Sequence, residues 1–276
     1  MEEHKGITKI DIEEAIRSKN PKLYKRLPRF VLNYIKRVTH EKEINEFLKI
    51  HGHKHDFEFL KAVIDYFEIT IKVIGEENLR KSGGVIYASN HPIGSIDGMA
   101  LMHVLGKHRK DLKFIVNDLL LQVKNLSGLF VGVNKHGKNA NNLVKDLDDL
   151  YGSDKAILVF PAGLVSRKQK GLIRDLEWKK SFITKAKKHQ HDIIPIYIHG
   201  KNSKKFYNLG LWRKRLGIKA NIEMFFLIDE MFRQKGKTLT FVIDKPIPYT
   251  RFDKTHTDLE WAQILKQEVY KLEKKI

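Results

Sequence analysis

The sequence predicts an α/β fold in which one domain holds a central, largely parallel sheet covered by helices on both faces. Short apolar runs alternate along most of the chain with longer amphipathic segments, as expected for strands and crossover helices. No internal repeat or Pro/Gly/Ser-rich linker divides this pattern. We therefore expect an α/β domain over residues 69–276 and a helical N-terminal extension, with possible membrane contact, over residues 1–68.

The N-terminal extension is predicted as helical from its apolar spacing. Residues 11–18 and roughly 21–50 form short basic amphipathic patterns, and within 28–38 the apolar residues recur at helical spacing. Residues 53–69 are a further helix candidate that leads into the first strand.

The α/β part alternates regularly from that point. The expected strands are 69–75, 85–89, 113–117, 129–134, 156–160, 192–198 and 238–244. The expected helices are 97–108, 118–125, 139–152, 175–189 and 256–276. The strands are short and rich in Val, Ile and Phe, which is typical of a parallel sheet buried on both faces.

Composition restricts the class of function. The chain has 276 residues and carries 52 Lys+Arg against 33 Asp+Glu, a net charge of +19. This charge favours polyanionic partners such as anionic lipid, an acidic carrier protein or nucleic acid. The absence of cysteine excludes disulfides, thiolate metal sites and a cysteine nucleophile, and it fits a reducing compartment.

The hydropathy pattern predicts no membrane span, because no window approaches the 18 or so apolar residues that a spanning helix requires. The charged first 16 residues also lack the apolar stretch of a signal peptide. We expect an intracellular protein that is soluble or attached to a membrane surface.

The segment NHPIGSIDG, residues 90–98, follows the apolar strand 85–89. In open α/β sheets, ligands bind at the carboxyl ends of the strands. If the loop folds back, Asp97 can fix the tautomer of His91, and the free ring nitrogen can deprotonate a hydroxyl or amine. On spacing alone, the simpler interpretation is a capped helix start with an incidental histidine.

A second loop, FPAGLVSR at residues 160–167, follows the strand 156–160 and should reach the same sheet edge. Its Pro and Gly can bring backbone amides near an oxyanion, and Ser166 and Arg167 can contact a carboxylate or phosphate.

Together, N-H-P-x-G-x-x-D-G and F-P-x-G-x-x-S-R resemble the glycerolipid acyltransferases, the 1-acylglycerol-3-phosphate acyltransferase-like proteins. That family has N-H-x-x-x-x-D as its first block and F-P-E-G-T-R-S as its third. Its less specific second and fourth blocks correspond to residues 129–134 and 193–196. The resemblance covers residues 70–245.

Two departures from the family pattern bear on the substrate. Five residues separate His91 from Asp97, where the family has four. The pattern N-H-P-x-G-x-x-D-G resembles the hemolysin-like subgroup, which includes bacterial acyltransferases for lyso-ornithine and lyso-glycine lipids. The family's third-block glutamate is Ala162 here, and its second-block arginine is Asn134 or Lys135. In the family these groups hold glycerol phosphate, so the resemblance implies a lyso-aminolipid acceptor, with 1-acylglycerol-3-phosphate as the alternative.

The resemblance implies direct O-acyl transfer from a thioester of acyl carrier protein or CoA, with His91 as general base, Asp97 as its partner and amides near Gly163 as oxyanion donors. It implies no metal and no organic cofactor. The expected substrate contacts are Asn90, Gly94, Ser95, Asn134, Lys135, Phe160, Pro161, Gly163, Ser166 and Arg167.

The stretch 201–219 holds seven Lys/Arg and no acidic residue, with aromatic residues interleaved. This composition suits the headgroup boundary of an anionic membrane, although the aromatics can instead belong to the core. The expected membrane contacts are Lys204, Lys205, Phe206, Trp212, Arg213 and Arg215. We therefore expect a cytoplasmic enzyme attached peripherally to the inner face of the cytoplasmic membrane.

Two other classes stay open from the residues alone: a non-catalytic lipid-binding relative and a basic nucleic-acid-binding protein. The second leaves both loop motifs unexplained and matches no RNA or DNA motif, so we expect no nucleic-acid partner.

Overall fold

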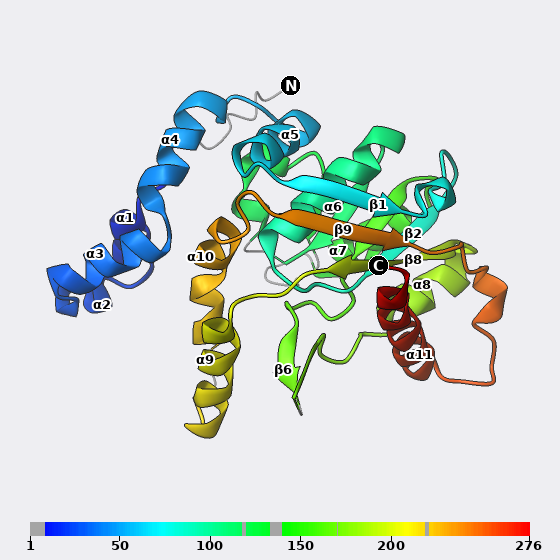
Figure 1. Cartoon of the computed structure of the whole chain (residues 1–276). Helices are drawn as coiled ribbons and strands as arrows, with labels where there is room; N and C mark the ends of the chain where they lie inside the picture. The colour runs from blue at the N-terminus through cyan, green and yellow to red at the C-terminus, as the bar shows by residue number, and fades with distance from the viewer. Residues whose placement is uncertain (1–8, 118–119, 133–139, 170, 219–220) are drawn as a thin grey trace.

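In the described part of the chain, seven strands form one sheet in the order β1-β9-β8-β2-β5-β3-β4 (Figure 1). The computed structural model describes residues 9–117, 120–132, 140–169, 171–218 and 221–276. The strands are β1 (Thr70–Ile74), β2 (Val85–Ser89), β3 (Lys113–Val116), β4 (Phe130–Gly132), β5 (Ala156–Val159), β8 (Asp192–His199) and β9 (Thr238–Ile243). All neighbouring pairs are parallel except β8 and β9, which confirms the largely parallel sheet.

The strand sequences explain the layers of the fold. Residues Val85 to Ala88 of β2 have no exposed surface. Val85 and Tyr87 face one apolar cluster, while Ile86 and Ala88 face a second cluster on the opposite side of the sheet. Strands buried on both faces need an apolar residue at every position, which is why these segments are continuous apolar runs.

Helices cover both faces, as the sequence predicts. One face carries α5 (Asp56–Tyr66) and α6 (Ser95–His108), whose apolar residues join the first cluster, and α4 (Glu41–His51) adds Phe47 and Leu48 to that cluster from beside α5. The other carries α7 (Ala140–Tyr151), α8 (Ser181–His189) and α11 (Asp258–Lys271), which join the second. Because α5 shares the first core with α6, the boundary expected at residue 68 falls inside one hydrophobic core.

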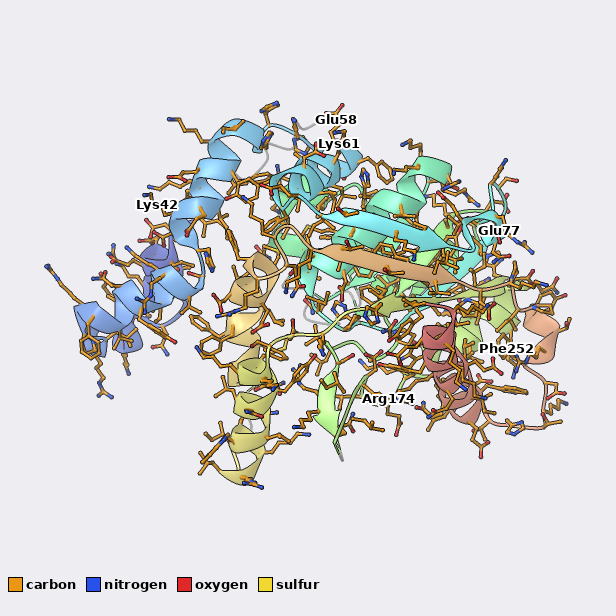
Figure 2. The ribbon with its side chains drawn as sticks, in the orientation of Figure 1. Lys42, Glu58, Lys61, Glu77, Arg174 and Phe252 are labelled. Carbon is orange, nitrogen blue, oxygen red and sulfur yellow. The ribbon has the colours of Figure 1, made fainter. Side chains whose placement is uncertain are left out.

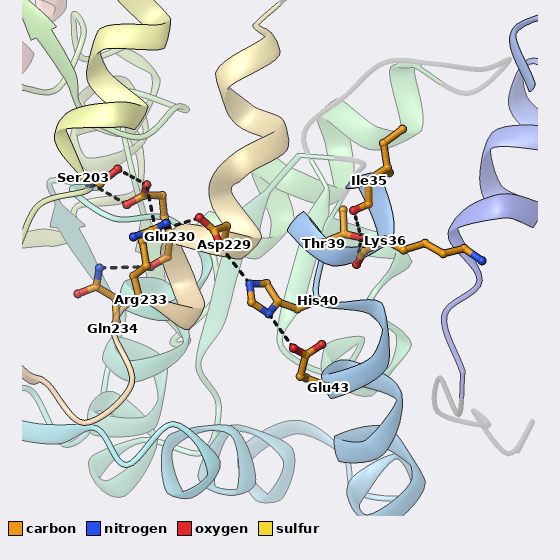
Figure 3. Close-up of polar contacts among 10 residues, drawn as sticks. All are labelled: Ile35, Lys36, Thr39, His40, Glu43, Ser203, Asp229, Glu230, Arg233 and Gln234. Carbon is orange, nitrogen blue, oxygen red and sulfur yellow. Dashed lines mark hydrogen bonds and ion pairs between the residues drawn. The ribbon is translucent and has the colours of Figure 1, made fainter. Parts of the chain in front are cut away.

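The first three helices, α1 (Ile12–Lys19), α2 (Pro21–Arg26) and α3 (Arg29–Val38), stand at one end of the molecule (Figure 1). His40, between α3 and α4, connects these helices to the rest of the molecule. It has left-handed backbone geometry, and its ring stacks on Phe232 with 3.8 Å between ring centroids. Its Nε2 lies 3.2 Å from Asp229 of α10 (Leu227–Phe232), and Nδ1 lies 3.3 Å from Glu43 (Figure 3).

Several elements were not predicted. A hairpin of β6 (Arg167–Gln169) and β7 (Leu172–Arg174) precedes α8, and α9 (Lys204–Arg215) and α10 follow β8. Short 3₁₀ turns occupy the described part of the expected helix 118–125. The 3₁₀ segments are η1 (Glu76–Asn78), η2 (Leu120–Gln122), η3 (Lys124–Leu126), η4 (Ile222–Phe226), η5 (Tyr249–Arg251) and η6 (Leu272–Lys275).

The parallel register places three loops at one edge of the sheet. Strands β8, β2 and β5 are adjacent and parallel, so the loops after His199, Ser89 and Val159 leave from the same end. None of the helices in the described residues is long and apolar enough to cross a bilayer.

Candidate active site

His91 and Asp97 meet at the carboxyl end of β2. His91 Nδ1 lies 2.9 Å from Asp97 Oδ1; the His91 side chain is 18% exposed and that of Asp97 is 0% exposed. Among the described residues, neither of these two buried atoms has another hydrogen-bond partner. The carboxylate therefore holds the imidazole by Nδ1 and leaves Nε2 as the nitrogen that can take a proton from a substrate.

Gly94 makes the five-residue spacing compatible with this contact. Its φ of 134° and ψ of −134° suit glycine, because a side chain rarely tolerates that backbone conformation. The turn directs the amides of Ile93 and Gly94 back to Asp97 Oδ2, at 2.8 and 3.2 Å. Both carboxylate oxygens of the buried Asp97 thus face a donor group, one on the loop and one on His91.

Phe160 packs against the imidazole ring of His91. Its ring stacks on the His91 ring with 4.2 Å between centroids and 16° between planes. The chain then turns, with the Gly163 amide donating to the Phe160 carbonyl at 2.9 Å and Gly163 in the left-handed region at φ +67°. Since that amide is engaged, only other amides of this loop can serve as the expected oxyanion donors.

Ser166 holds the His91 loop in place by hydrogen bonds. Its amide donates to the His91 carbonyl at 2.7 Å, and its hydroxyl donates to Asp175 Oδ1 at 2.6 Å. Asp175 also accepts from the His91 amide at 3.2 Å and from Trp178 Nε1 at 2.9 Å. Burial raises the pKa of the Asp175 carboxyl, although these three donors oppose that shift.

Arg167 is buried in an ion cluster. Its Nη2 lies 3.3 Å from Glu223 Oε1, and Arg213 Nε lies 2.8 Å from Glu223 Oε2. Burial lowers the pKa of the Arg167 guanidinium, opposed by the charge of Glu223. Arg167 therefore has an internal counter-ion, and its expected role as a substrate contact stays a prediction.

Three other expected substrate contacts have structural partners. The Asn90 side chain links β2 to β8: its Nδ2 donates to the Ile198 carbonyl at 3.0 Å, and its Oδ1 accepts from the Ile198 backbone amide at 2.7 Å. Ser166 is buried as described above, and the Pro161 carbonyl accepts from the Lys179 amide at 3.0 Å. Ser95 begins α6 and is partly exposed. Asn134 and Lys135 lie outside the described residues.

The expected membrane contacts divide into two groups. Phe206 is 1% exposed and packs with Val165 and Tyr207, and Arg213 is buried against Glu223. Both assignments are therefore corrected, because these side chains face the interior. The exposed members are Lys204, Lys205, Trp212 and Arg215.

Sequence reasoning missed four residues around the site: Asp175, Glu223, Asn202 and Lys179. Asn202 donates to the Ile93 carbonyl at 2.9 Å, and the Lys179 ammonium sits above Gly163, where an added Cβ would meet Nζ at 3.2 Å. Glu223 is an isolated charge in an apolar run, whereas Asp175 and Asn202 lie among other polar residues and give no sign of burial in the sequence.

Comparison with known proteins identifies the family of the chain. The Acyltransferase family model matches residues 14–276. Two similar proteins carry the name lyso-glycine lipid O-acyltransferase. The Bacteroides thetaiotaomicron protein is 46% identical over 95% of this chain and 97% of its own length. The Phocaeicola vulgatus protein is 44% identical over 95% of each chain.

The fold is similar to that of the 1-acyl-sn-glycerophosphate acyltransferase from Thermotoga maritima, with a TM-score of 0.50 at 16% identity. The match covers 88% of this chain and 89% of the other. The family match and the two relatives show that the chain is an enzyme and belongs to the acyltransferase family.

Proposed function

We propose that this enzyme transfers a fatty acyl group from a thioester, carried by acyl carrier protein or CoA, to the hydroxyl of a lyso-glycine lipid. The observation that carries the proposal is the buried His91–Asp97 pair, which leaves one imidazole nitrogen free at the sheet edge. The names of the two relatives at 46% and 44% identity support the acceptor.

In the proposed reaction, the acceptor hydroxyl attacks the thioester carbonyl while His91 Nε2 removes its proton. The new oxygen–carbon bond forms, the carbon–sulfur bond breaks, and the proton passes from His91 to the leaving thiolate. Asp97 stabilises the imidazolium between these steps. General-base assistance of this kind contributes about 10²–10⁴-fold to rate. The thioester supplies the activation, so no metal or organic cofactor enters the scheme.

We infer that the acceptor carries a carboxylate rather than a phosphate, because the groups that would hold a phosphate are replaced or already paired. Ala162 stands where the related glycerolipid enzymes have glutamate, and its side chain is buried among apolar residues. Arg167 is already paired with Glu223. Lys179, exposed and lying over Gly163, is the cation that we assign to the single carboxylate of a glycine head group.

The main alternative is acyl transfer to 1-acylglycerol-3-phosphate, the activity in the name of the Thermotoga maritima protein. The pairing of Arg167 and the alanine at 162 weigh against it. Purified protein should be offered lyso-glycine lipid, lyso-ornithine lipid and lysophosphatidic acid with acyl carrier protein or CoA thioesters. We expect the lyso-glycine lipid to give the highest kcat/KM. Efficient acylation of lysophosphatidic acid, with the aminolipids ignored, would refute the proposal.

A further inference from the structure

Exposed apolar side chains gather on α9 and the segment that follows it. Trp212 is 61% exposed and Leu216 is 67% exposed, and their spacing of four residues puts them on one side of the helix. Ile218 and Phe225 are also exposed large hydrophobics. We call these four residues the α9 face.

Contacts connect the two ends of the α9 face. The Lys205 ammonium lies 5.1 Å from the centroid of the Phe226 ring, and Phe226 packs edge-on against Phe225 at 5.9 Å. At the end of α9, the Ile218 amide donates to the Arg213 carbonyl at 3.0 Å, which turns the chain back beside the helix. Phe226 therefore lies against the side of α9 that carries Lys205, and Lys205 stands seven residues before Trp212.

The charges around this face have one sign. Lys204, Lys205, Lys214 and Arg215 are all exposed on α9. The only acidic residue between positions 201 and 226 is Glu223, and it is buried between two arginines. Cations interleaved with exposed Trp and Leu side chains match the headgroup–acyl boundary of an anionic bilayer. A carrier protein bound mainly by charge would not require the apolar residues.

Residues just before α9 and just after η4 approach the catalytic loop. Asn202, two residues before α9, donates to the Ile93 carbonyl at 2.9 Å. Leu227, directly after η4, approaches Gly94, where an added Cβ would lie 3.4 Å from its methyl group. Figure 1 shows α9 and the β6–β7 hairpin extending from the same side of the sheet. Leu172 of the hairpin is exposed, whereas Arg174, labelled in Figure 2, lies over the Tyr270 ring of α11.

We infer that the α9 face docks the enzyme on an anionic lipid bilayer and so brings the His91 loop to an acceptor held in that bilayer. The inference rests on the proposed function for its choice of a lipid surface. It assigns a role to the exposed Trp212 of α9 and to the cations beside it.

The test measures binding to phosphatidylcholine vesicles with and without phosphatidylglycerol, using the full chain. Lys214→Gln/Arg215→Gln should weaken binding to the anionic vesicles by about 25-fold, since each cation near such a surface contributes roughly fivefold. Trp212→Ser/Leu216→Ser should lower binding that persists at high salt. The matched controls are Lys245→Gln/Lys254→Gln and Leu259→Ser, which remove exposed residues of the same types elsewhere.

Activity on acceptor dispersed in neutral detergent separates this inference from the proposed function. The α9 variants should keep detergent activity and lose activity on vesicles. If the wild type is inactive in detergent, the proposed function is refuted, and vesicle binding still tests the docking inference independently. The docking inference is overturned if the α9 variants bind vesicles like the wild type. It is also overturned if Phe30→Ser, on the exposed side of α3, abolishes binding by itself, or if the α9 variants lose only turnover with the acyl carrier protein thioester.

Discussion

His91 Nδ1 and Asp97 Oδ1 lie 2.9 Å apart although five residues separate them in the chain. The contact depends on the Gly94 turn, which aims two backbone amides at the other oxygen of Asp97. The longer spacing therefore preserves a His–Asp pair rather than disrupting one.

Gly94→Ala should disturb this pair through the backbone. The φ of +134° is strained for a side chain, so we expect a loss of about 1–3 kcal/mol in the free energy of unfolding, together with a fall in kcat. Gly236→Ala is the matched control, because Gly236 also has positive φ, at +71°, with open space around it. Chemical denaturation and turnover should show lower stability in both variants and lower turnover only in Gly94→Ala. Equal turnover in the two would contradict the role of this turn.

Asp175→Asn should destabilise the protein by about 1–3 kcal/mol at neutral pH, because the new NH₂ group must face a donor among His91, Ser166 and Trp178. Burial raises the pKa of Asp175 in the folded state above its ordinary 3.8. The folded wild type therefore binds this proton more tightly than the unfolded chain and gains stability as pH falls from neutral through the raised pKa. Unfolding curves across that range should show the wild-type advantage widening; a constant difference would count against a buried, titrating Asp175.

Glu223→Gln should be strongly destabilising, because it leaves Arg167 and Arg213 buried beside each other without their shared carboxylate. Removing one partner of a buried ion cluster costs about 3–5 kcal/mol. The control is Glu77→Gln, an exposed glutamate on η1 (Figure 2). If both variants unfold at the same denaturant concentration, the cluster does not stabilise the region between β6 and α9.

Lys179→Ala should raise KM for a carboxylate-bearing acceptor by up to about fivefold, in line with an exposed ion pair, and leave kcat near the wild-type value. Lys180→Ala removes the neighbouring exposed lysine and should change neither constant. A fall in kcat without a change in KM would show that Lys179 does not bind the acceptor.

The sequence predicted the buried strands and the sheet edge well, because β2 up to Ala88 and all of β5 are apolar and each strand is followed by a loop with Pro and Gly. It also identified His91 and Asp97 as a pair. The antiparallel pairing of β9 with β8 was not predicted, because the sequence of β9 resembles that of the parallel strands and its direction depends on the path of the chain from α10.

The roles of Phe206, Arg213 and Arg167 depend on tertiary partners. An arginine on a basic stretch gives no sign that a single distant glutamate neutralises it, and Glu223 lies 56 positions after Arg167. Alternation of aromatic and basic residues on α9 also fits both an exposed and a buried face, and only packing on Val165 shows which side is inside.

The most direct test of the account is the turnover of His91→Ala with lyso-glycine lipid and an acyl thioester. His199→Ala, which changes an exposed histidine at the same sheet edge, serves as the control, and circular dichroism verifies that both variants fold. The account predicts that His91→Ala melts like the wild type and loses about 10²–10⁴-fold in kcat, while the control keeps its activity. A folded His91→Ala variant with near wild-type turnover would contradict it.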